Sequence, residues 1–423
     1  MLEVTFVGRG LIDRLPETFA GPNVFLRVVG PPDGPLLKSK FIDEYITTFS
    51  QVGGSTLAQE LIGRPELRSH LQGLIIFSDD EMVRVLAGSS LTAKEKARIL
   101  PAGNPDAFDV LGSKVGLADA CQRLGIASPR QMVARSLADL PEAIARVGYP
   151  CLVKAATGGG GAGITRLRSL GDIHPRDRHE QILDSYVVQE YVHGQEILVD
   201  VAFRDGRVAG WLYTQAVDGT QEFGPSTVRR YQDPPSTDFV ESLATLADWG
   251  QFNGLFNCAF IREESSGRHL LIEADPRPNA WHQFGPRFRV DWPRVLANVG
   301  GEPIHPEFGS EKIDVHLYPR EISHALSSLQ LSLLTPWLKR APGTWDTRSH
   351  VDPAVNAAEA LSVVGPGLVK ALQPPWRLLP ETIRHRPRAI WAKTQFLSLL
   401  GIPWSPPQDG LAGGLERPRP SVH

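Results

Sequence analysis

A lysine followed by a run of glycines is the clearest chemical signal in the chain. The apolar residues Leu152 and Val153 lead to Lys154 and predict a buried strand that holds the lysine stem and leaves its ammonium free. Glycines let backbone N–H groups approach an anion closely and let a loop open and close. The stretch therefore predicts a polyphosphate clamp, with a surface loop after an edge strand as the alternative. The glycines are Gly158, Gly159, Gly160, Gly161 and Gly163.

A second stretch, residues 269–279, suits a divalent cation. Glu273 and Asp275 follow an apolar run and are separated by one residue, so on a strand both carboxylates point to the same face. Two such carboxylates repel each other unless a cation lies between them, and Mg²⁺ takes oxygen ligands from proteins and phosphates. Arg277 follows, and its planar guanidinium suits a phosphate. The alternative is a solvated strand end with one Asp/Arg pair.

Together these stretches resemble the ATP-grasp superfamily, which includes biotin carboxylase, carbamoyl-phosphate synthetase and D-alanine–D-alanine ligase. The resemblance extends over residues 105–290, where Lys114 and a downstream Gly-Ile-x-x-Pro motif at residues 125–129 match the opening of the family's ATP-binding module. It implies that Lys114 and Lys154 contact the phosphates of ATP. The glycines would then form the flap that closes over the triphosphate.

The resemblance also implies where the adenosine part of ATP lies. The family's adenine hinge is matched by Gln189, Glu190, Tyr191 and Val192, which would contact adenine mainly through backbone groups. Glu196 is matched to the carboxylate that accepts hydrogen bonds from the ribose hydroxyls, a role that suits its two oxygens. Without the resemblance, Glu190 and Glu196 would be an ordinary exposed strand pair.

The sequence departs from the family at the metal site. Family members carry a carboxylate or amide on the strand before the metal-binding pair, where this chain has Ala259. Asn257, two residues earlier, lies on the same face and could partly compensate. Asp275 also stands where the family has asparagine. These departures keep open a protein with altered or impaired catalysis.

Four further residues are expected near a substrate. Arg229 and Arg230 lie in the polar segment 218–235, which is expected to be a loop over the active site. They could meet an anionic substrate, with a solvated basic pair as the equal alternative. Asn279 and His282 follow Arg277 and are expected to border the acceptor pocket. His282 could be a general base, although a histidine near a site is more often a hydrogen-bonded positioning residue.

The predicted fold class is α/β (α+β). Alternating strand-like and helical pieces in the first hundred or so residues indicate a parallel sheet, whose carboxyl-end loops carry ligands in such folds. Asp79 and Asp80 fall at such an end, and one of them is expected to cap a helix. The expected order is an N-terminal parallel α/β domain (1–104), a small ATP-grasp subdomain with the flap (105–184), a large subdomain with the metal site (185–320), a mostly helical extension (321–404) and a disordered tail (405–423).

The composition fits a soluble enzyme. The chain has 423 residues and a formal net charge of −3, so there is no bulk basic footprint for nucleic acid. Its three cysteines, Cys121, Cys151 and Cys258, are scattered, which predicts reduced, buried thiols and a cytoplasmic location. No apolar run approaches the length of a signal peptide core or a membrane span.

The resemblance implies an ATP-dependent carboxylate–amine ligase that uses Mg²⁺, or Mn²⁺ in its place. Such enzymes transfer the γ-phosphoryl group to a carboxylate, and an amine then attacks the acyl phosphate to give an amide, ADP and phosphate. Lys154 and Arg277 would be the catalytic residues, and the substrates would be a small carboxylate and an amine, such as an amino acid or its derivative. A homodimer is a common arrangement in the family. Two alternatives stay open, a phosphotransferase and a nucleotide-binding protein with impaired catalysis.

Overall fold

The computed structural model of the chain describes residues 1–10, 12–49, 53–161, 163–169, 172, 185–219, 222–297, 301–308, 312–327, 346–347, 356–357 and 360. The chain divides into two units, Met1–Tyr318 with Ala341–Glu359, and Pro319–Arg340 with Ala360–His423. In the second unit the described part is mainly helix α10 (Arg320–Ser327). Most of the predicted helical extension and all of the predicted tail lie outside the described residues.

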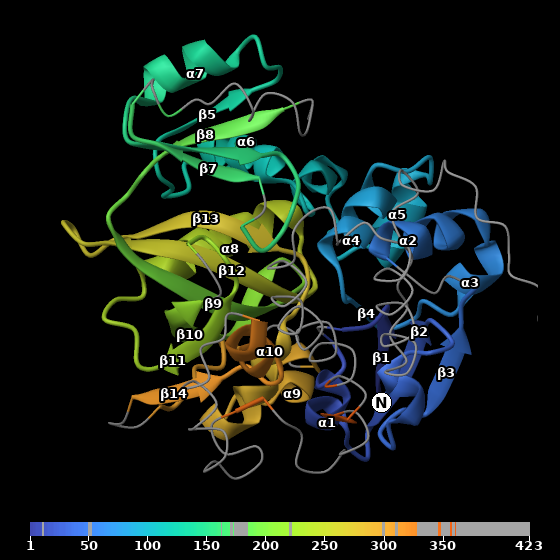
Figure 1. Ribbon diagram of the computed structural model, residues 1–423. Helices are drawn as coiled ribbons and strands as arrows, with labels where there is room; N and C mark the ends of the chain where they lie inside the picture. Colours follow the sequence, from blue (N-terminus) through green and yellow to red (C-terminus); the bar gives the residue numbers. More distant parts are fainter. Residues whose placement is uncertain are drawn as a thin grey trace, which may run out of the picture. The chain divides into compact units, whose positions relative to one another are not determined.

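Residues 1–104, here called the N-terminal domain, contain the predicted parallel sheet (Figure 1). Its strand order is β3-β2-β1-β4, and β4 is buried along its whole length because helices cover the sheet. The strands are β1 (Leu2–Val7), β2 (Val24–Gly30), β3 (Glu44–Thr47) and β4 (Leu74–Phe77). The helices are α1 (Leu15–Phe19), η1 (Pro35–Lys38), α2 (Gly54–Gly63), α3 (Pro65–Ser69), α4 (Asp80–Ala87) and α5 (Ala93–Ile99).

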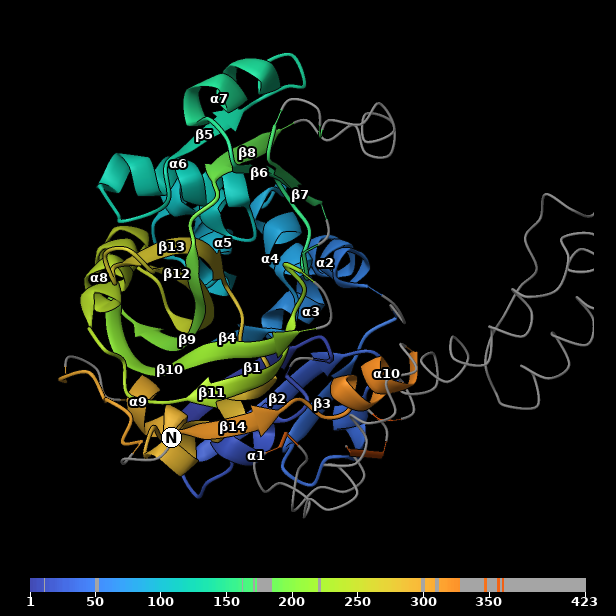
Figure 2. The same ribbon diagram turned by 60° about the vertical axis from the view of Figure 1, so that its left-hand side comes forward.

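Residues 105–190, here called the small lobe, form an antiparallel sheet with strand order β5-β8-β6-β7. Strand β8 lies beyond residue 184, yet it pairs with β5 and β6, so this sheet extends to Glu190. Helix α7 packs on the sheet through a small apolar core (Figures 1 and 2). The strands are β5 (Gln131–Ala134), β6 (Cys151–Ala155), β7 (Ile164–Leu167) and β8 (Tyr186–Glu190), and the helices are η2 (Pro105–Val110), α6 (Lys114–Leu124) and α7 (Leu140–Val147).

Residues 194–318, here called the large lobe, form a six-stranded antiparallel sheet with order β13-β12-β9-β10-β11-β14. The prediction of one loop over 218–235 is wrong in part, because β10 runs to Gly219 and residues 226–231 form β11. The strands are β9 (Gly194–Arg204), β10 (Arg207–Gly219), β11 (Ser226–Tyr231), β12 (Gly254–Glu263), β13 (His269–Asp275) and β14 (Ile313–His316). The helices are α8 (Asp238–Gly250), η5 (Ala280–Phe288) and α9 (Trp292–Ala297).

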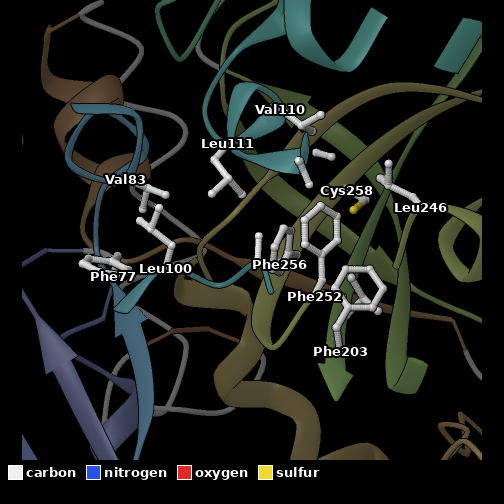
Figure 3. Close-up of a cluster of buried hydrophobic side chains, with 14 of the residues drawn as sticks. Phe77, Val83, Leu100, Val110, Leu111, Phe203, Leu246, Phe252, Phe256 and Cys258 are labelled. Atoms are coloured by element: carbon white, nitrogen blue, oxygen red, sulfur yellow. The ribbon is translucent and has the colours of Figure 1, made fainter. Parts of the chain in front are cut away.

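A single buried apolar cluster joins the N-terminal domain to the large lobe. Phe77, at the end of β4, belongs to the same cluster as Phe203 and Phe256 on the large-lobe sheet (Figure 3). Because this core is shared, the start of α4 is held in a fixed position relative to β12 and β13.

The cysteines agree with the prediction of buried thiols. Cys121, Cys151 and Cys258 are all free and buried. No helix in the described ranges is long and apolar enough to cross a bilayer.

Candidate nucleotide-binding site

Lys154 lies in the middle of the small-lobe sheet, where the surrounding protein shields its side chain from water. It sits on β6 between Ile164 of β7 and Val187 of β8, and it is only 5% exposed. Burial penalises the ammonium and lowers the pKa of Lys154 to about 8, against a smaller opposing effect of Glu273. An anionic partner would stabilise the charged form of such a buried lysine.

Lys114 connects the small lobe to the carboxylates of the large lobe. It is the first residue of α6, which starts where the Ser113 hydroxyl accepts a hydrogen bond from the Gly116 N–H. The Lys114 Nζ donates to the Gly158 carbonyl at 2.6 Å and lies 3.1 Å from Glu273 Oε1. The predicted phosphate lysine, the flap and the predicted metal ligand therefore meet at one point.

The register of the large-lobe sheet confirms that Glu273 and Asp275 share a face. Residues directly opposite each other in antiparallel strands point to the same side, and Glu273 lies opposite Ala259 on β12. Asp275 lies opposite Asn257, which in turn lies opposite Asp200 on β9. Asn257 therefore lies on the same face as Ala259, as the spacing predicted. Ala259 places only a methyl group beside Glu273.

Arg277 is clamped between two carboxylates. Its Nη2 lies 2.9 Å from Asp275 Oδ2 and 2.7 Å from Asp80 Oδ2, and its Nε donates to Asp80 at 2.8 Å. Burial raises the pKa of Asp275 well above its usual value, and the negative charges of Asp80 and Glu273 raise it further. In the free protein Arg277 offsets part of this repulsion.

The sequence analysis did not predict that Asp80 lies beside Arg277. The structure confirms one cap, because the Asp79 side chain accepts from the Met82 N–H at 3.0 Å. Asp80, the next residue, turns instead toward Arg277, which lies 197 positions along the chain. The only sequence signal was the position of Asp80 at the carboxyl end of a parallel strand.

The donor set suits a divalent cation that is shared with phosphate. Within the described ranges, no group of three or more His, Cys, Asp or Glu side chains is arranged to hold a metal by itself. Glu273 and Asp275 nevertheless crowd two carboxylates on one face and recruit Lys114 and Arg277 as cations. Mg²⁺ bound by one or two carboxylates and by substrate phosphates fits this arrangement.

The glycine flap rests against a loop of the large lobe. A Cβ at Gly161, whose φ is +80°, would lie 2.3 Å from the Phe223 carbonyl oxygen, so only glycine fits there. Gly160 approaches Pro225 of the same loop, whereas a Cβ at Gly159 would meet nothing within 4 Å. The flap therefore needs glycine at some positions because it packs closely, and at others the space is open.

The predicted hinge starts with the last two residues of β8, and Gln189 lies on the same face of the sheet as Lys154. The Gln189 amide donates to Gln131 Oε1 at 2.8 Å, and Gln189 is 3% exposed. The Glu190 carboxylate accepts from the Arg130 N–H at 2.7 Å. The Tyr191 ring lies 3.6 Å from the guanidinium carbon of Arg166. Val192 follows at the start of the connection to β9.

Glu196 faces the same groups as the phosphate-binding residues. It is solvent-exposed, yet enough protein atoms surround it that desolvation raises its pKa, while the positive charge of Arg229 opposes that rise most strongly. Glu273 and Lys154 also act on it electrostatically. Glu196 is therefore within electrostatic reach of both Lys154 and Glu273.

Arg229 and Arg230 go to opposite faces of β11, because successive strand residues alternate. Arg229 is 6% exposed and its guanidinium lies 3.5 Å from Asp200 and 4.9 Å from the centre of the Trp281 ring. Arg230 instead forms a two-pronged pair with Asp314 of β14 at 2.7 and 2.8 Å. Of the two arginines, Arg229 is therefore the one beside the site.

Asn279 and His282 both approach Asp200, a residue that the sequence analysis did not identify. The Asn279 amide donates to Asp200 Oδ1 at 3.2 Å, and His282 Nδ1 lies 3.5 Å from the same oxygen. His282 is fully buried, which lowers its pKa to about 4 and keeps the ring neutral. His282 is therefore a buried, neutral neighbour of Asp200.

Sequence comparisons and structure comparisons differ sharply for this chain. No protein-family model and no curated protein matches the sequence. Among solved structures, N5-carboxyaminoimidazole synthetase from Staphylococcus aureus with ADP matches with a TM-score of 0.59 at 14% identity, over 80% of this chain and 86% of that one. The chain has an ATP-grasp fold.

Two other ATP-grasp structures agree with this assignment. The biotin carboxylase domain dimer of the Hydrogenobacter thermophilus 2-oxoglutarate carboxylase, in complex with MgADP, ADP and bicarbonate, matches with a TM-score of 0.55 at 16% identity over 71% of this chain and 70% of that one. Phosphoribosylamine–glycine ligase from Thermotoga maritima matches with a TM-score of 0.51 at 16% identity over 72% of this chain and 78% of that one. At such identities the likeness concerns the fold.

Proposed function

We propose that the protein is an ATP-dependent carboxylate–amine ligase that forms an amide through an acyl phosphate and releases ADP and phosphate. The observation that carries the proposal is the meeting of two small-lobe lysines with two large-lobe carboxylates and Arg277. Lys114 lies 3.1 Å from Glu273, and Lys154 is buried beside the same carboxylate. Phosphoryl transfer depends mostly on such positioning and charge neutralisation.

Some of these residues bind ATP, and others stabilise the charge that develops during the reaction. Lys114 and Lys154 bind the phosphates, and the flap excludes water that would hydrolyse the acyl phosphate. Gln189 to Val192 hold the adenine, and Glu196 accepts hydrogen bonds from the ribose. Arg277 steadies the acyl phosphate and the tetrahedral oxyanion that forms when the amine attacks.

Glu273 and Asp275 would hold Mg²⁺ together with the phosphates. When bound, Mg²⁺ supplies positive charge to the transferring phosphoryl group. Mn²⁺, which takes the same oxygen ligands, would substitute for it. Among the similar structures, one was crystallised with ADP and another with MgADP, which supports this assignment.

The acceptors are proposed from chemistry and from the structural neighbours. Arg229, the buried arginine beside Arg277, would attract the carboxylate. The phosphoribosylamine–glycine ligase among the neighbours is named for an amine and an amino acid, which supports amide formation between small molecules here.

The test is to incubate the protein with Mg-ATP and pooled carboxylates and amines, and to quantify ADP, AMP and phosphate separately. We expect ADP and free phosphate in equal amounts, dependent on both pools. AMP would refute the acyl-phosphate route, and phosphate retained on the product would indicate a phosphotransferase.

Ala259 favours a second candidate, a nucleotide-binding protein with impaired catalysis. It places a methyl group opposite Glu273 where a metal ligand was expected. Tight binding of Mg-ATP without turnover under any acceptor pool would support this candidate over the ligase.

A further inference from the structure

Asp80 enters the site from the N-terminal domain, and the fold fixes its position. It begins α4 directly after β4, and the adjacent Asp79 carries the helix cap. Phe77, three residues earlier, is locked into the core shared with the large lobe (Figure 3). The fold therefore holds the Asp80 carboxylate against Arg277.

Asp80 has an unused hydrogen-bond acceptor at this point. Its Oδ2 accepts from Arg277 at 2.7–2.8 Å, but Oδ1 is buried and has no hydrogen-bond partner among the described residues. A buried carboxylate oxygen without a donor is costly, and it is satisfied when a ligand supplies an N–H or O–H.

The charge around Asp80 favours a cationic ligand group. The negative charges of Glu273 and Asp79 act on Asp80, and Arg277 must serve both Asp80 and Asp275. Once Arg277 turns to a phosphorylated carboxylate, Asp80 loses the only cation that is hydrogen-bonded to it in the described part of the chain. A primary ammonium can then donate N–H groups to Asp80 while its nitrogen lies next to the acyl carbon.

We propose that Asp80 binds the acceptor amine as its ammonium ion and takes up its proton, which would make Asp80 a catalytic residue. This inference rests on the proposed ligase function and names the acceptor site within it. It also assigns a chemical role to the N-terminal domain, namely recognition of a cationic amine.

The step balances as follows in atoms and electrons. The ammonium gives one proton to Asp80 Oδ1, and the freed lone pair attacks the acyl carbon to form the C–N bond. The bond between the acyl carbon and the phosphate oxygen breaks, and phosphate leaves with that electron pair. The second nitrogen proton passes to the departing phosphate, and Asp80 returns its proton to solvent.

The experiment makes two nucleophiles compete for one acyl phosphate. Hydroxylamine is mostly uncharged at neutral pH, so it needs neither an ammonium site nor a base, whereas ¹⁵N-ammonium needs both. Protein, Mg-ATP and pooled carboxylic acids are incubated with both nucleophiles, and mass spectrometry gives the ratio of ¹⁵N-amide to hydroxamate. Because the products share one intermediate, this ratio does not depend on how fast the intermediate forms.

We expect Asp80→Asn to lower the ratio by about 100-fold, the contribution typical of a positioned general base. Glu81→Gln is the matched control, since Glu81 is the next residue on α4 and is mostly exposed beside Arg84. It should leave the ratio unchanged.

Each outcome decides between the two claims. A ratio that Asp80→Asn leaves unchanged, including a ratio that is already negligible in the wild type, overturns the assignment of Asp80. Loss of both products in equal proportion also overturns it, because Asp80 would then act on Arg277 or on the first step. A wild-type protein that forms no hydroxamate with any pooled acid would refute the ligase proposal itself, and the inference with it.

Discussion

At the residue scale, Lys154 shows how function and stability oppose each other. Its ammonium is buried, and the lowering of its pKa from 10.5 to about 8 corresponds to a destabilisation of about 3 kcal/mol below pH 8. Because the folded state holds this proton less tightly than the unfolded state, the destabilisation fades as the pH rises from about 8 toward 10.5.

We therefore expect Lys154→Met to abolish turnover while it raises the melting temperature at neutral pH. Methionine fills a similar volume without a buried charge. Lys114→Met is the control, because Lys114 is paired with Glu273 and its loss should bring no such gain. A Lys154→Met protein that melts earlier than the wild type, measured by calorimetry, would contradict this account of the lysine.

The same lysine predicts how ATP binding depends on pH. ATP favours the charged ammonium, so binding requires proton uptake once the pH exceeds about 8. Titration calorimetry should show a dissociation constant that is flat below pH 8 and then rises up to tenfold per pH unit, and Lys154→Arg should remove the rise. A flat profile through pH 9.5 in the wild type would mean that Lys154 does not contact the phosphates.

Ala259 makes a third prediction at this scale. Ala259→Glu adds a buried carboxylate opposite Glu273, so repulsion should lower the melting temperature in the absence of metal. Mg²⁺ should restore it by more than it stabilises the wild type. Ala259→Gln, which adds the same bulk without charge, should show no extra effect of Mg²⁺, and equal effects in both variants would argue against a cation at this face.

The candidate site residues that could be predicted are those whose signals lie within one short stretch of sequence. Lys154 with its glycines, and Glu273 with Asp275, stand within short stretches whose strand periodicity fixes their faces. Asp80 and Asp200 could not be assigned in this way, because their partners Arg277 and Asn279 lie on elements far along the chain. Only the tertiary packing brings them together.

At the element scale, the flap and the loop at residues 222–225 act as a pair. Gly161 approaches the Phe223 carbonyl too closely for any side chain, whereas Gly159 has open space around it. The β10–β11 connection therefore sets where the flap rests, and substitution of the flap glycines checks this directly.

Gly161→Ala should hold the flap away from this resting place, and Gly159→Ala should not. We expect the first variant to raise the KM for ATP at least tenfold and to release phosphate without forming product, since water reaches the acyl phosphate. The second variant should stay within about twofold of the wild type in both measurements. Equal behaviour of the two alanine variants would show that contact with Phe223 is not needed for closure.

The strand β11 shows why polarity alone misled the prediction of a loop. Residues 226–231 alternate between the two faces of the sheet, and their polar side chains have partners there, Arg229 with Asp200 and Arg230 with Asp314. A strand that pairs on both sides can carry charged residues when each finds an ion partner. Those partners lie on β9 and β14 and are invisible in the local sequence.

At the scale of the whole molecule, the fold class was predictable because the strands of different sheets carry different patterns of apolar and polar residues. The N-terminal strands are short, apolar and separated by helices, which is typical of parallel sheets, and polar residues alternate with apolar ones at the end of β13, in Glu273 and Asp275. The common core of the N-terminal domain and the large lobe was not predictable, since it joins Phe77 to aromatic residues of β9 and β12. That core is what holds Asp80 of the N-terminal domain against Arg277.

The central claim is that a carboxylate oxygen becomes bonded to the γ-phosphoryl group of ATP. The most direct measurement is to supply carboxylic acids labelled with ¹⁸O in the carboxyl group, with Mg-ATP and an amine, and to analyse the phosphate released. The account predicts one ¹⁸O atom in each phosphate formed during ligation. Phosphate that carries no label, alongside consumption of ATP, would contradict the acyl-phosphate mechanism and with it the proposed ligase function.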